Sequence, residues 1–213
     1  QRVAAEIQYL VQAHNLPYSE FAILFRGNHQ SRPLEKELQL LKIPYHITGG
    51  TAFLDRGEVK DVLAWLRIIA NPDDDAAFLR AVTSPKREVG AGSLEKLAQM
   101  ARHAHIPLSL AAQNSSYVNA LSARPAAGLS EFMRLIVRLR AQSKSAKAAD
   151  IVRAVVSESG ILGQLRLETK NEALFLRRKE NLDELAQWFE AERRPSGAGD
   201  LAAQLALLSN ADR

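Results

Sequence analysis

The sequence predicts a mainly α-helical protein with a small α/β piece at its N-terminal end. Two short apolar runs, residues 21–25 and 43–48, have the length and composition of β-strands. Both precede Gly49 and Gly50, and from residue 55 onward the apolar residues recur only at helical spacing. We therefore expect an α/β piece over residues 1–54 and an all-helical region over residues 55–213.

Four elements are expected in the α/β piece. Apolar residues recur at helical spacing over residues 2–14, and Pro17 marks the end of this helix. The first strand, residues 21–25 (Phe-Ala-Ile-Leu-Phe), is expected to be buried. A second helix continues to Leu41, with Pro33 near its first turn, where the missing N–H costs little. The second strand stops at Gly49 and Gly50, because glycines permit backbone angles that other residues avoid.

The residues that follow the first strand, Arg26, Gly27 and Asn28, form the first candidate site. In open α/β sheets, ligands bind outside the carboxyl ends of the strands. A guanidinium offers phosphate a bidentate fork, and an amide can reach sugar or base without requiring a particular sequence. The placement therefore favours a phosphate-binding or nucleic-acid-binding edge. Ordinary turn residues after a buried strand are the alternative.

The region after residue 55 is expected to contain only helices. Acidic residues open two of them, at Asp55 and at residues 73–75, as the helix dipole favours. Basic residues cluster at 86–87, 134–147 and 177–179. Each cluster is either a solvated helix face or part of a surface that binds a polyanion.

The turn at residues 84–93 (Ser-Pro-Lys-Arg-Glu-Val-Gly-Ala-Gly-Ser) is the second candidate site. A glycine-rich turn that leads into a helix presents free N–H groups to phosphate, and Lys86 and Arg87 add positive charge. Ser93 is the expected N-cap of the helix. Glu88 would repel phosphate if its carboxylate pointed at it. An ordinary connection between two helices is the alternative.

The composition excludes several classes of protein. The chain is 46% hydrophobic and 24% charged, which is typical of a globular protein. It has no cysteine, so thiolate metal sites and disulfides are excluded. A net charge of +4 is only weak support for a nucleic-acid partner. No apolar run approaches the ~20 residues that span a bilayer, and we expect no signal peptide.

Several blocks follow one another in the first hundred residues: 26–32 (Arg-Gly-Asn-His-Gln-Ser-Arg), 43–45 (Ile-Pro-Tyr), 49–61, 64–80 and 83–90. Together they resemble the UvrD/Rep/PcrA group of superfamily 1 DNA helicases. A later block, residues 178–185 (Arg-Lys-Glu-Asn-Leu-Asp-Glu-Leu), is similar to the same family. Residues 27–29 and 86–88 lean towards the Rep branch, although many relatives have Gly-Ile-Gly where this chain has Glu-Val-Gly at 88–90.

The resemblance implies a place in the enzyme for each region. Residues 1–54 would be part of the second RecA-like (P-loop type) motor domain, and residues 55–213 the inserted helical subdomain, called 2B. A core role is the alternative for Phe53, and an ion pair for Arg56. The implied DNA-binding residues are Arg26, Asn28, Arg32, Phe53, Arg56 and Lys60, towards single-stranded DNA, and Lys86, Arg87, Gly90 and Ser93, towards duplex.

The resemblance also implies a cytoplasmic, nucleoid-associated bacterial enzyme that moves 3′ to 5′ on DNA with ATP and Mg²⁺. Forked DNA and replication or repair proteins would be its partners, without a membrane. No glycine is followed by Lys-Ser or Lys-Thr, so a P-loop is missing. We therefore expect an internal fragment, inactive alone, without catalytic, cofactor or metal residues. The alternatives are a non-enzymatic helical module that binds nucleic acid or protein, and a helicase–nuclease relative.

Overall fold

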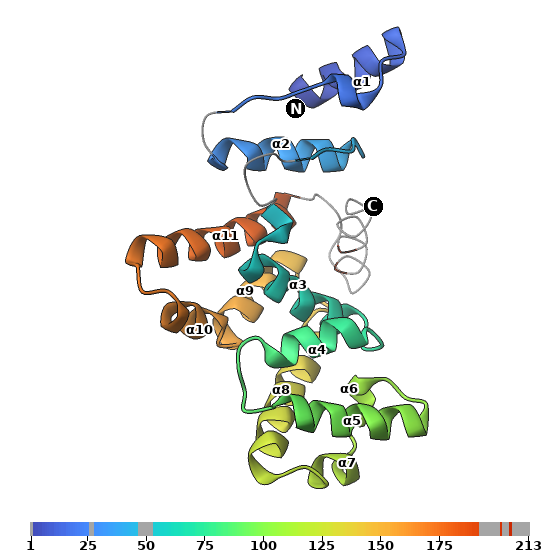
Figure 1. Cartoon of the computed structure of the whole chain (residues 1–213), viewed down its shortest axis with the longest axis vertical. Helices are drawn as coiled ribbons and strands as arrows, with labels where there is room; N and C mark the ends of the chain where they lie inside the picture. The colour runs from blue at the N-terminus through green and yellow to red at the C-terminus, as the bar shows by residue number, and fades with distance from the viewer. Residues whose placement is uncertain (1, 26–27, 47–52, 192–200, 202–204, 206–213) are drawn as a thin grey trace. The chain divides into compact units, whose positions relative to one another are not determined.

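The computed structural model describes residues 2–25, 28–46, 53–191, 201 and 205. Within this part of the chain, helices and short connections make up the whole architecture (Figure 1). The chain divides into two compact units, residues 1–56 with 206–213 and residues 57–205. The expectation of a mainly helical fold is confirmed.

The described residues of the N-terminal unit form two α-helices, α1 (Arg2–His14) and α2 (Asn28–Leu40), and two 3-10 turns, Tyr18–Glu20 and Phe53–Asp55. A small apolar core holds α1 and α2 together. Ala4 and Ile7 of α1 and Leu38 of α2 are buried in it, with Ile43 from the segment after α2. This core follows from the helical spacing of apolar residues in both segments.

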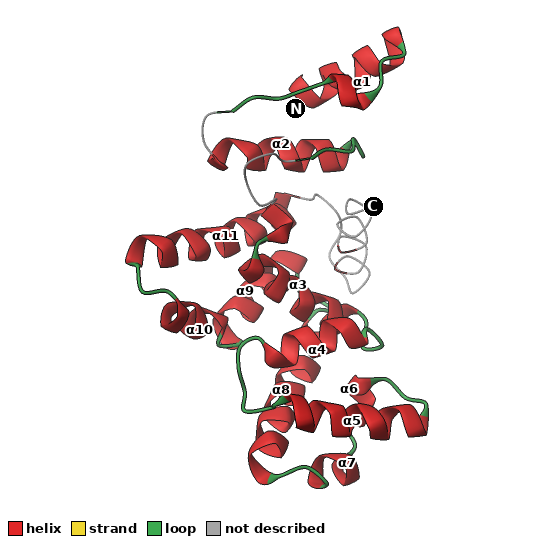
Figure 2. Cartoon of the chain, viewed as in Figure 1, coloured by secondary structure: helices red, strands yellow, loops and turns green. Residues whose placement is uncertain are grey.

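The first of the two strands expected in this unit does not form a paired strand in the structure. Phe21 is extended, with φ −104° and ψ 135°, but residues 21–25 form no paired strand, and the described part of the chain contains none (Figure 2). Phe21 and Ile23 pack on the core, whereas Leu24 is 94% exposed. The segment is thus apolar on both faces but partly buried on only one. A β-strand requires hydrogen bonds to a neighbouring strand, and composition alone does not supply that neighbour.

The second expected strand, residues 43–48, is described only as far as residue 46. Ile43 is buried and Tyr45 packs on the same core. The amide of Gln39 donates a hydrogen bond to the Tyr45 hydroxyl at 2.9 Å. Gly49 and Gly50 lie outside the described residues.

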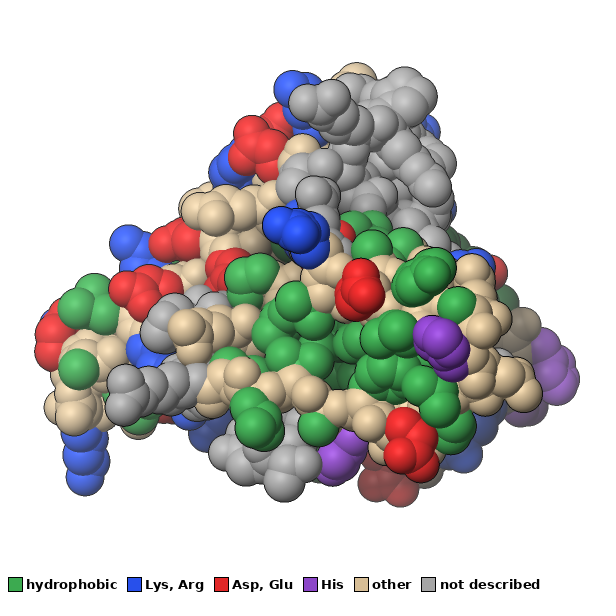
Figure 3. Space-filling view, turned by 90° about the horizontal axis from the view of Figure 1, so that it is seen from above, with side chains coloured by type: hydrophobic (Ala, Val, Ile, Leu, Met, Phe, Trp, Pro, Cys, Tyr) green, Lys and Arg blue, Asp and Glu red, His purple; other side chains and the backbone are tan. Residues whose placement is uncertain are grey.

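On the face of the molecule seen in Figure 3, hydrophobic side chains gather in one area.

The larger unit is a helical assembly. Its helices are α3 (Gly57–Ala70), α4 (Asp75–Thr83), α5 (Ala91–Ala104), α6 (Leu108–Ala111), α7 (Ser115–Asn119), α8 (Ala123–Gln142), α9 (Ala148–Glu158), α10 (Ile161–Glu168) and α11 (Glu172–Ala191). Helix α3 is central, because it contacts α4, α8, α9 and α11. No helix among the described residues is long and apolar enough to cross a membrane.

Three aromatic rings fill the centre of this unit. Trp65 of α3, Phe78 of α4 and Phe132 of α8 are almost completely buried. Phe132 makes edge-to-face contacts with both other rings, at centroid distances of 5.0 Å to Trp65 and 5.6 Å to Phe78. Burying each such side chain contributes roughly 1.5–3 kcal/mol, so this cluster is a main source of stability.

The acidic residues at 73–75 start a helix as expected. Asp74 is the N-cap of α4, and its Oδ1 accepts a hydrogen bond from the N–H of Ala77 at 2.9 Å. Asp75 Oδ1 accepts from the N–H of Leu108 at 2.8 Å, which ties α4 to the start of α6. These carboxylates therefore satisfy backbone donors, which is the usual role of acids at a helix start.

Candidate nucleic-acid interface

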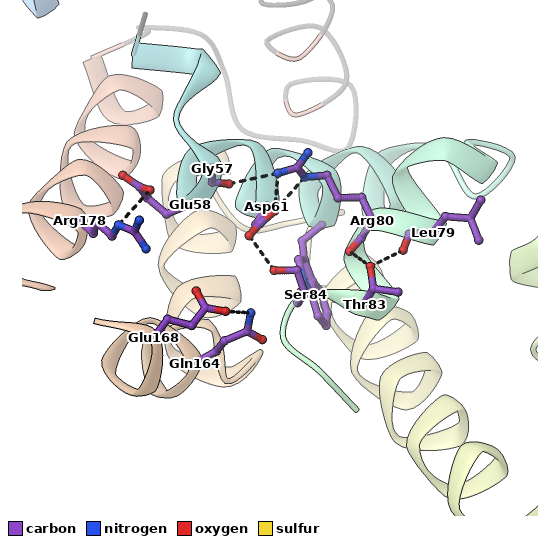
Figure 4. A network of polar contacts seen from close by, with 11 residues as sticks. Gly57, Glu58, Asp61, Leu79, Arg80, Thr83, Ser84, Gln164, Glu168 and Arg178 are labelled. Carbon is purple, nitrogen blue, oxygen red and sulfur yellow. Dashed lines mark hydrogen bonds and ion pairs between the residues drawn. The ribbon is translucent and has the colours of Figure 1, made fainter. Parts of the chain in front are cut away.

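The loop between α4 and α5 is anchored near its start by hydrogen bonds to two other helices. The Ser84 hydroxyl donates to Asp61 Oδ2 at 2.7 Å (Figure 4), and the Ser84 carbonyl accepts from Trp65 Nε1 at 2.9 Å. Farther along, the N–H of Lys86 donates to Gln164 Oε1 of α10 at 2.7 Å. The loop backbone is thus tied to α3 and to α10.

Asp61 also joins the loop to helix α4. Its Oδ1 lies 2.8 Å from Nε of Arg80, and Nη2 of Arg80 donates to the Gly57 carbonyl at 3.3 Å (Figure 4). One carboxylate therefore receives a serine hydroxyl from the loop and a guanidinium from α4. This arrangement fixes the entry of the loop relative to the first turn of α3.

Arg87, a predicted DNA contact, points into the protein. Its Nη1 donates to the carbonyls of Ala81 (3.2 Å) and Pro85 (2.7 Å), and its Nη2 donates to the carbonyl of Ser159 (2.7 Å). These acceptors belong to α4, to the loop and to the C-cap of α9. The side chain therefore links three segments of the fold.

The guanidinium of Arg87 also lies against the aromatic core. Its Cζ is 4.7 Å from the centroid of the Trp65 ring and 5.4 Å from that of Phe132. Burial lowers the pKa of Arg87 to about 10, and the negative charge of Glu131 opposes this shift. The group remains charged at neutral pH, and the ring faces and carbonyl oxygens stabilise that charge.

Lys86 and Glu88, the neighbours of Arg87, are exposed. Glu88 has a φ of 59°, in the left-handed region that favours glycine. Beside them lies a hollow of about 520 Å³ between the loop and the first turns of α8. It is lined by Lys86, Arg87, Glu88, Ala123, Arg124, Ala127, Gly128 and Glu131. Its charged groups have both signs.

Helix α5 begins where the loop ends. Gly90 is its N-cap, so the expectation that Ser93 caps this helix is wrong. Ser93 lies inside the first turn, where its N–H donates to the Gly90 carbonyl at 3.1 Å. The N–H groups that precede it in the first turn have no acceptor within the helix. The start of α5 follows exposed Lys86 a few residues along the chain, and N–H groups at a helix start can bind an anion.

The candidate residues of the N-terminal unit are only partly described. Arg26 lies outside the described residues, as do the side chains of Asn28 and Arg32 in α2. Phe53 is buried, and its N–H donates to Glu35 Oε2 at 2.9 Å. The guanidinium of Arg56 lies 5.5 Å from the Phe53 ring centroid.

Lys60 lies on an exposed face of α3 in the other unit. The core position of Phe53 agrees with the alternative that the sequence left open.

The later family-like block, residues 178–185, makes a buried hydrogen bond to helix α3. Glu58 of α3 and Asn181 of α11 are both buried, and Asn181 Nδ2 donates to Glu58 Oε1 at 2.6 Å. Arg178 Nε lies 3.8 Å from Glu58 Oε2 (Figure 4). The sequence did not indicate this pairing, because the two residues are 123 positions apart.

Gly128 and Arg124 were also not foreseen from the sequence. Both line the hollow beside the loop. An isolated glycine inside a helical pattern such as that of α8 commonly has a packing reason, and this pattern was visible at Gly128. Nothing in the local sequence distinguishes Arg124 from other exposed arginines.

Among the described residues, no group of three or more His, Asp or Glu side chains is placed to hold a metal ion. What the candidate site offers instead is exposed cations, amides and the N–H groups at a helix start. These groups suit the binding of a phosphate backbone.

Comparisons with known proteins agree with the resemblance. The family described as UvrD-like helicase C-terminal domain matches residues 1–208. ATP-dependent DNA helicase Rep of Escherichia coli (strain K12) is 40% identical over 162 residues, which are 75% of this chain and 24% of the relative. ATP-dependent DNA helicase PcrA of Bacillus subtilis (strain 168) is 35% identical over 216 residues, covering 100% of this chain and 29% of the relative.

DNA helicase II of Escherichia coli (strain K12) is 38% identical over 167 residues, which are 78% of this chain and 23% of the relative. The chain thus spans about a quarter of the length of the curated relatives it matches.

Proposed function

Since this chain belongs to the UvrD-like helicase C-terminal domain family, we propose that it is the DNA-contacting part of an ATP-dependent DNA helicase of the UvrD/Rep/PcrA type. Its helical unit would bind duplex DNA at a fork and regulate unwinding. Its N-terminal unit would bind the single strand. Cytoplasmic localisation at the nucleoid, and encounters with replication or repair proteins, belong to the same proposal.

The observation that carries the duplex contact is the anchored loop between α4 and α5. Lys86 is exposed on this loop, while its own N–H is fixed to Gln164. The start of α5 follows at Gly90. An exposed lysine on an anchored loop that leads into a helix N-terminus can contact a phosphate without reading the base sequence, which is what a helicase requires.

The single-strand contact is proposed for Arg26, Asn28 and Arg32, and for Arg56 and Lys60 farther along the chain. Helix α2 begins at Asn28, so residues 26–28 lead into a helix N-terminus, which favours phosphate. Residues 1–54 would belong to the second RecA-like motor domain and residues 55–213 to the inserted 2B subdomain. The division of the chain into compact units at residues 56 and 57 supports this boundary.

We place the sites for ATP and Mg²⁺ in other parts of the whole enzyme. The residues of this chain do not fit a nucleotide site, since the sequence lacks a P-loop. We therefore assign this chain no step in ATP hydrolysis and expect no activity from it alone.

Binding of the 213-residue chain to a forked DNA, measured by fluorescence anisotropy over a range of salt concentrations, tests the duplex contact. We expect Lys86→Ala to weaken binding and to lower the slope of log affinity against log salt by about 0.9, the value for one phosphate contact. Lys170→Ala is the control, because this exposed lysine follows α10 and lies outside the three basic clusters.

A second measurement uses single-stranded DNA. Arg26→Ala should weaken binding, whereas Arg2→Ala, at an exposed position of α1, should not. If the wild-type chain binds neither DNA at low salt, the proposed role in DNA contact is wrong. If it binds, but Lys86→Ala and Arg26→Ala bind equally well, these residues are not the contacts.

A further inference from the structure

We propose that Arg87 and Gly128 are positioning residues that hold the loop of residues 84–90 so that Lys86 meets the DNA backbone. In this arrangement Arg87, although cationic and next to Lys86, does not itself bind phosphate. The inference rests on the proposed duplex contact of this loop and names the residues on which that contact depends.

The bonding of Arg87 separates it from a phosphate ligand. Both terminal nitrogens donate to backbone carbonyls, at 2.7 to 3.2 Å, and the guanidinium lies against two aromatic rings. A guanidinium that contacts phosphate must direct its planar fork outward. Here the fork is directed at three segments of the protein, so the side chain fixes the loop instead.

Gly128 of α8 forms the surface on which the loop lies. A Cβ atom at this position would be 2.1 Å from the carbonyl oxygen of Arg87 and 3.3 Å from Cγ2 of Val89. The first contact is with backbone, so a side chain cannot be accommodated unless the loop or the helix moves. Val89 is itself buried. The loop backbone therefore approaches α8 at a point where only glycine leaves enough space.

The position of the Lys86 backbone follows from the contacts of Arg87 and Gly128, together with one hydrogen bond of its own. Its N–H is held by Gln164 on one side, and the next residue is held by the carbonyl acceptors and by Gly128. Fixing the backbone on both sides limits where the ammonium group can reach. Displacing the loop would therefore remove the Lys86 contact even when the lysine is still present.

The test uses forked DNA and three variants of the whole chain. Lys86→Ala should lower affinity roughly eightfold at 0.1 M salt, the loss expected for one phosphate contact. Arg87→Lys keeps the charge but cannot reproduce the forked hydrogen bonds, and Gly128→Ala removes no charge at all. We expect each of these two to lower affinity by a similar factor.

A double variant shows whether Arg87 acts through Lys86. Adding Arg87→Lys to Lys86→Ala should cost less than about twofold more, because the contact that Arg87 positions is already lost. Gly163→Ala is the glycine control, since a Cβ at this helical position meets no atom within 4 Å. Circular dichroism should show that each variant is folded. Hydrogen exchange of the amides at 86–90 should be faster in Gly128→Ala and Arg87→Lys.

The outcomes separate the two claims. If Lys86→Ala weakens binding while Arg87→Lys and Gly128→Ala bind like the wild type, the positioning role is overturned and the duplex contact stands. If Arg87→Lys weakens binding equally with and without Lys86, Arg87 acts independently and the inference is wrong. If Lys86→Ala has no effect, the proposed duplex contact fails, and the positioning role fails with it. Should Gly128→Ala not fold, the Arg87 and Lys86 cycle decides.

Discussion

The hydrogen bond between Asn181 and Glu58 should be one of the strongest single polar contributions to the stability of the helical unit. Glu58 is 7% exposed and Asn181 is 3% exposed, so both groups have left water. Their 2.6 Å contact joins α3 to α11. A hydrogen bond to a charged group contributes about 1.5–3 kcal/mol, and a buried carboxylate that loses its donor incurs a desolvation penalty.

We expect Asn181→Ala to lower the free energy of unfolding by about 2–3 kcal/mol. Arg178 compensates little, because its Nε is 3.8 Å from Glu58 Oε2 and its side chain is 35% exposed. Asn181→Ala also removes other contacts of the side chain. The pair energy is therefore taken from a double-mutant cycle with Glu58→Ala, in which we expect a coupling of about 1.5–2 kcal/mol.

Urea unfolding followed by tryptophan fluorescence measures these changes. Both tryptophans of the chain, Trp65 and Trp188, lie in the helical unit, so the emission reports on that unit. Gln187→Ala, an exposed amide on the same helix, is the control and should change stability by less than about 0.5 kcal/mol. A coupling below about 0.5 kcal/mol would refute the reasoning, because the two residues would then contribute independently.

Three further changes test local features by the same unfolding measurement. Glu88→Gly should raise the free energy of unfolding by about 0.5–1 kcal/mol because glycine adopts the left-handed backbone without strain. The control Glu95→Gly, in the middle of α5, should lower the free energy of unfolding by about 1 kcal/mol. If both variants changed the free energy of unfolding in the same direction, this reasoning would be wrong. Asp74→Ala removes the N-cap of α4 and should cost about 1 kcal/mol, while exposed Asp73→Ala should cost little. Phe132→Ala should cost about 3–5 kcal/mol; a loss below 1 kcal/mol would mean that the aromatic cluster is not the centre of the core.

The extended segment at residues 21–25 shows how composition can be misread. Its five apolar residues predicted a buried strand, yet only Phe21 and Ile23 pack on the core. The local sequence indicated an extended backbone, which the structure shows at Phe21, and alternate side chains of an extended chain point to opposite faces. It could not supply a paired strand or cover the second face, since both depend on other segments.

The Lys86-Arg87 pair shows the same limit for charge. In the sequence the two cations are equivalent candidates for DNA contact. In the structure one is exposed, while the other lies on Trp65 and Phe132 and donates to three carbonyls. The acceptor Ser159 is 72 positions away from Arg87, and no local pattern indicates it.

The sequence by itself determined the helical character of the chain, the helix start at the acids of residues 73–75 and the family. Helical periodicity and capping depend on residues within a few positions of one another, and the family depends on the order of short blocks. Only the tertiary structure decided which cation is partly buried against the core, which glycine the loop packs on and which amide contacts Glu58. Burial and close approach are properties of segments brought together from distant parts of the chain, and in these cases no local sequence pattern specified them.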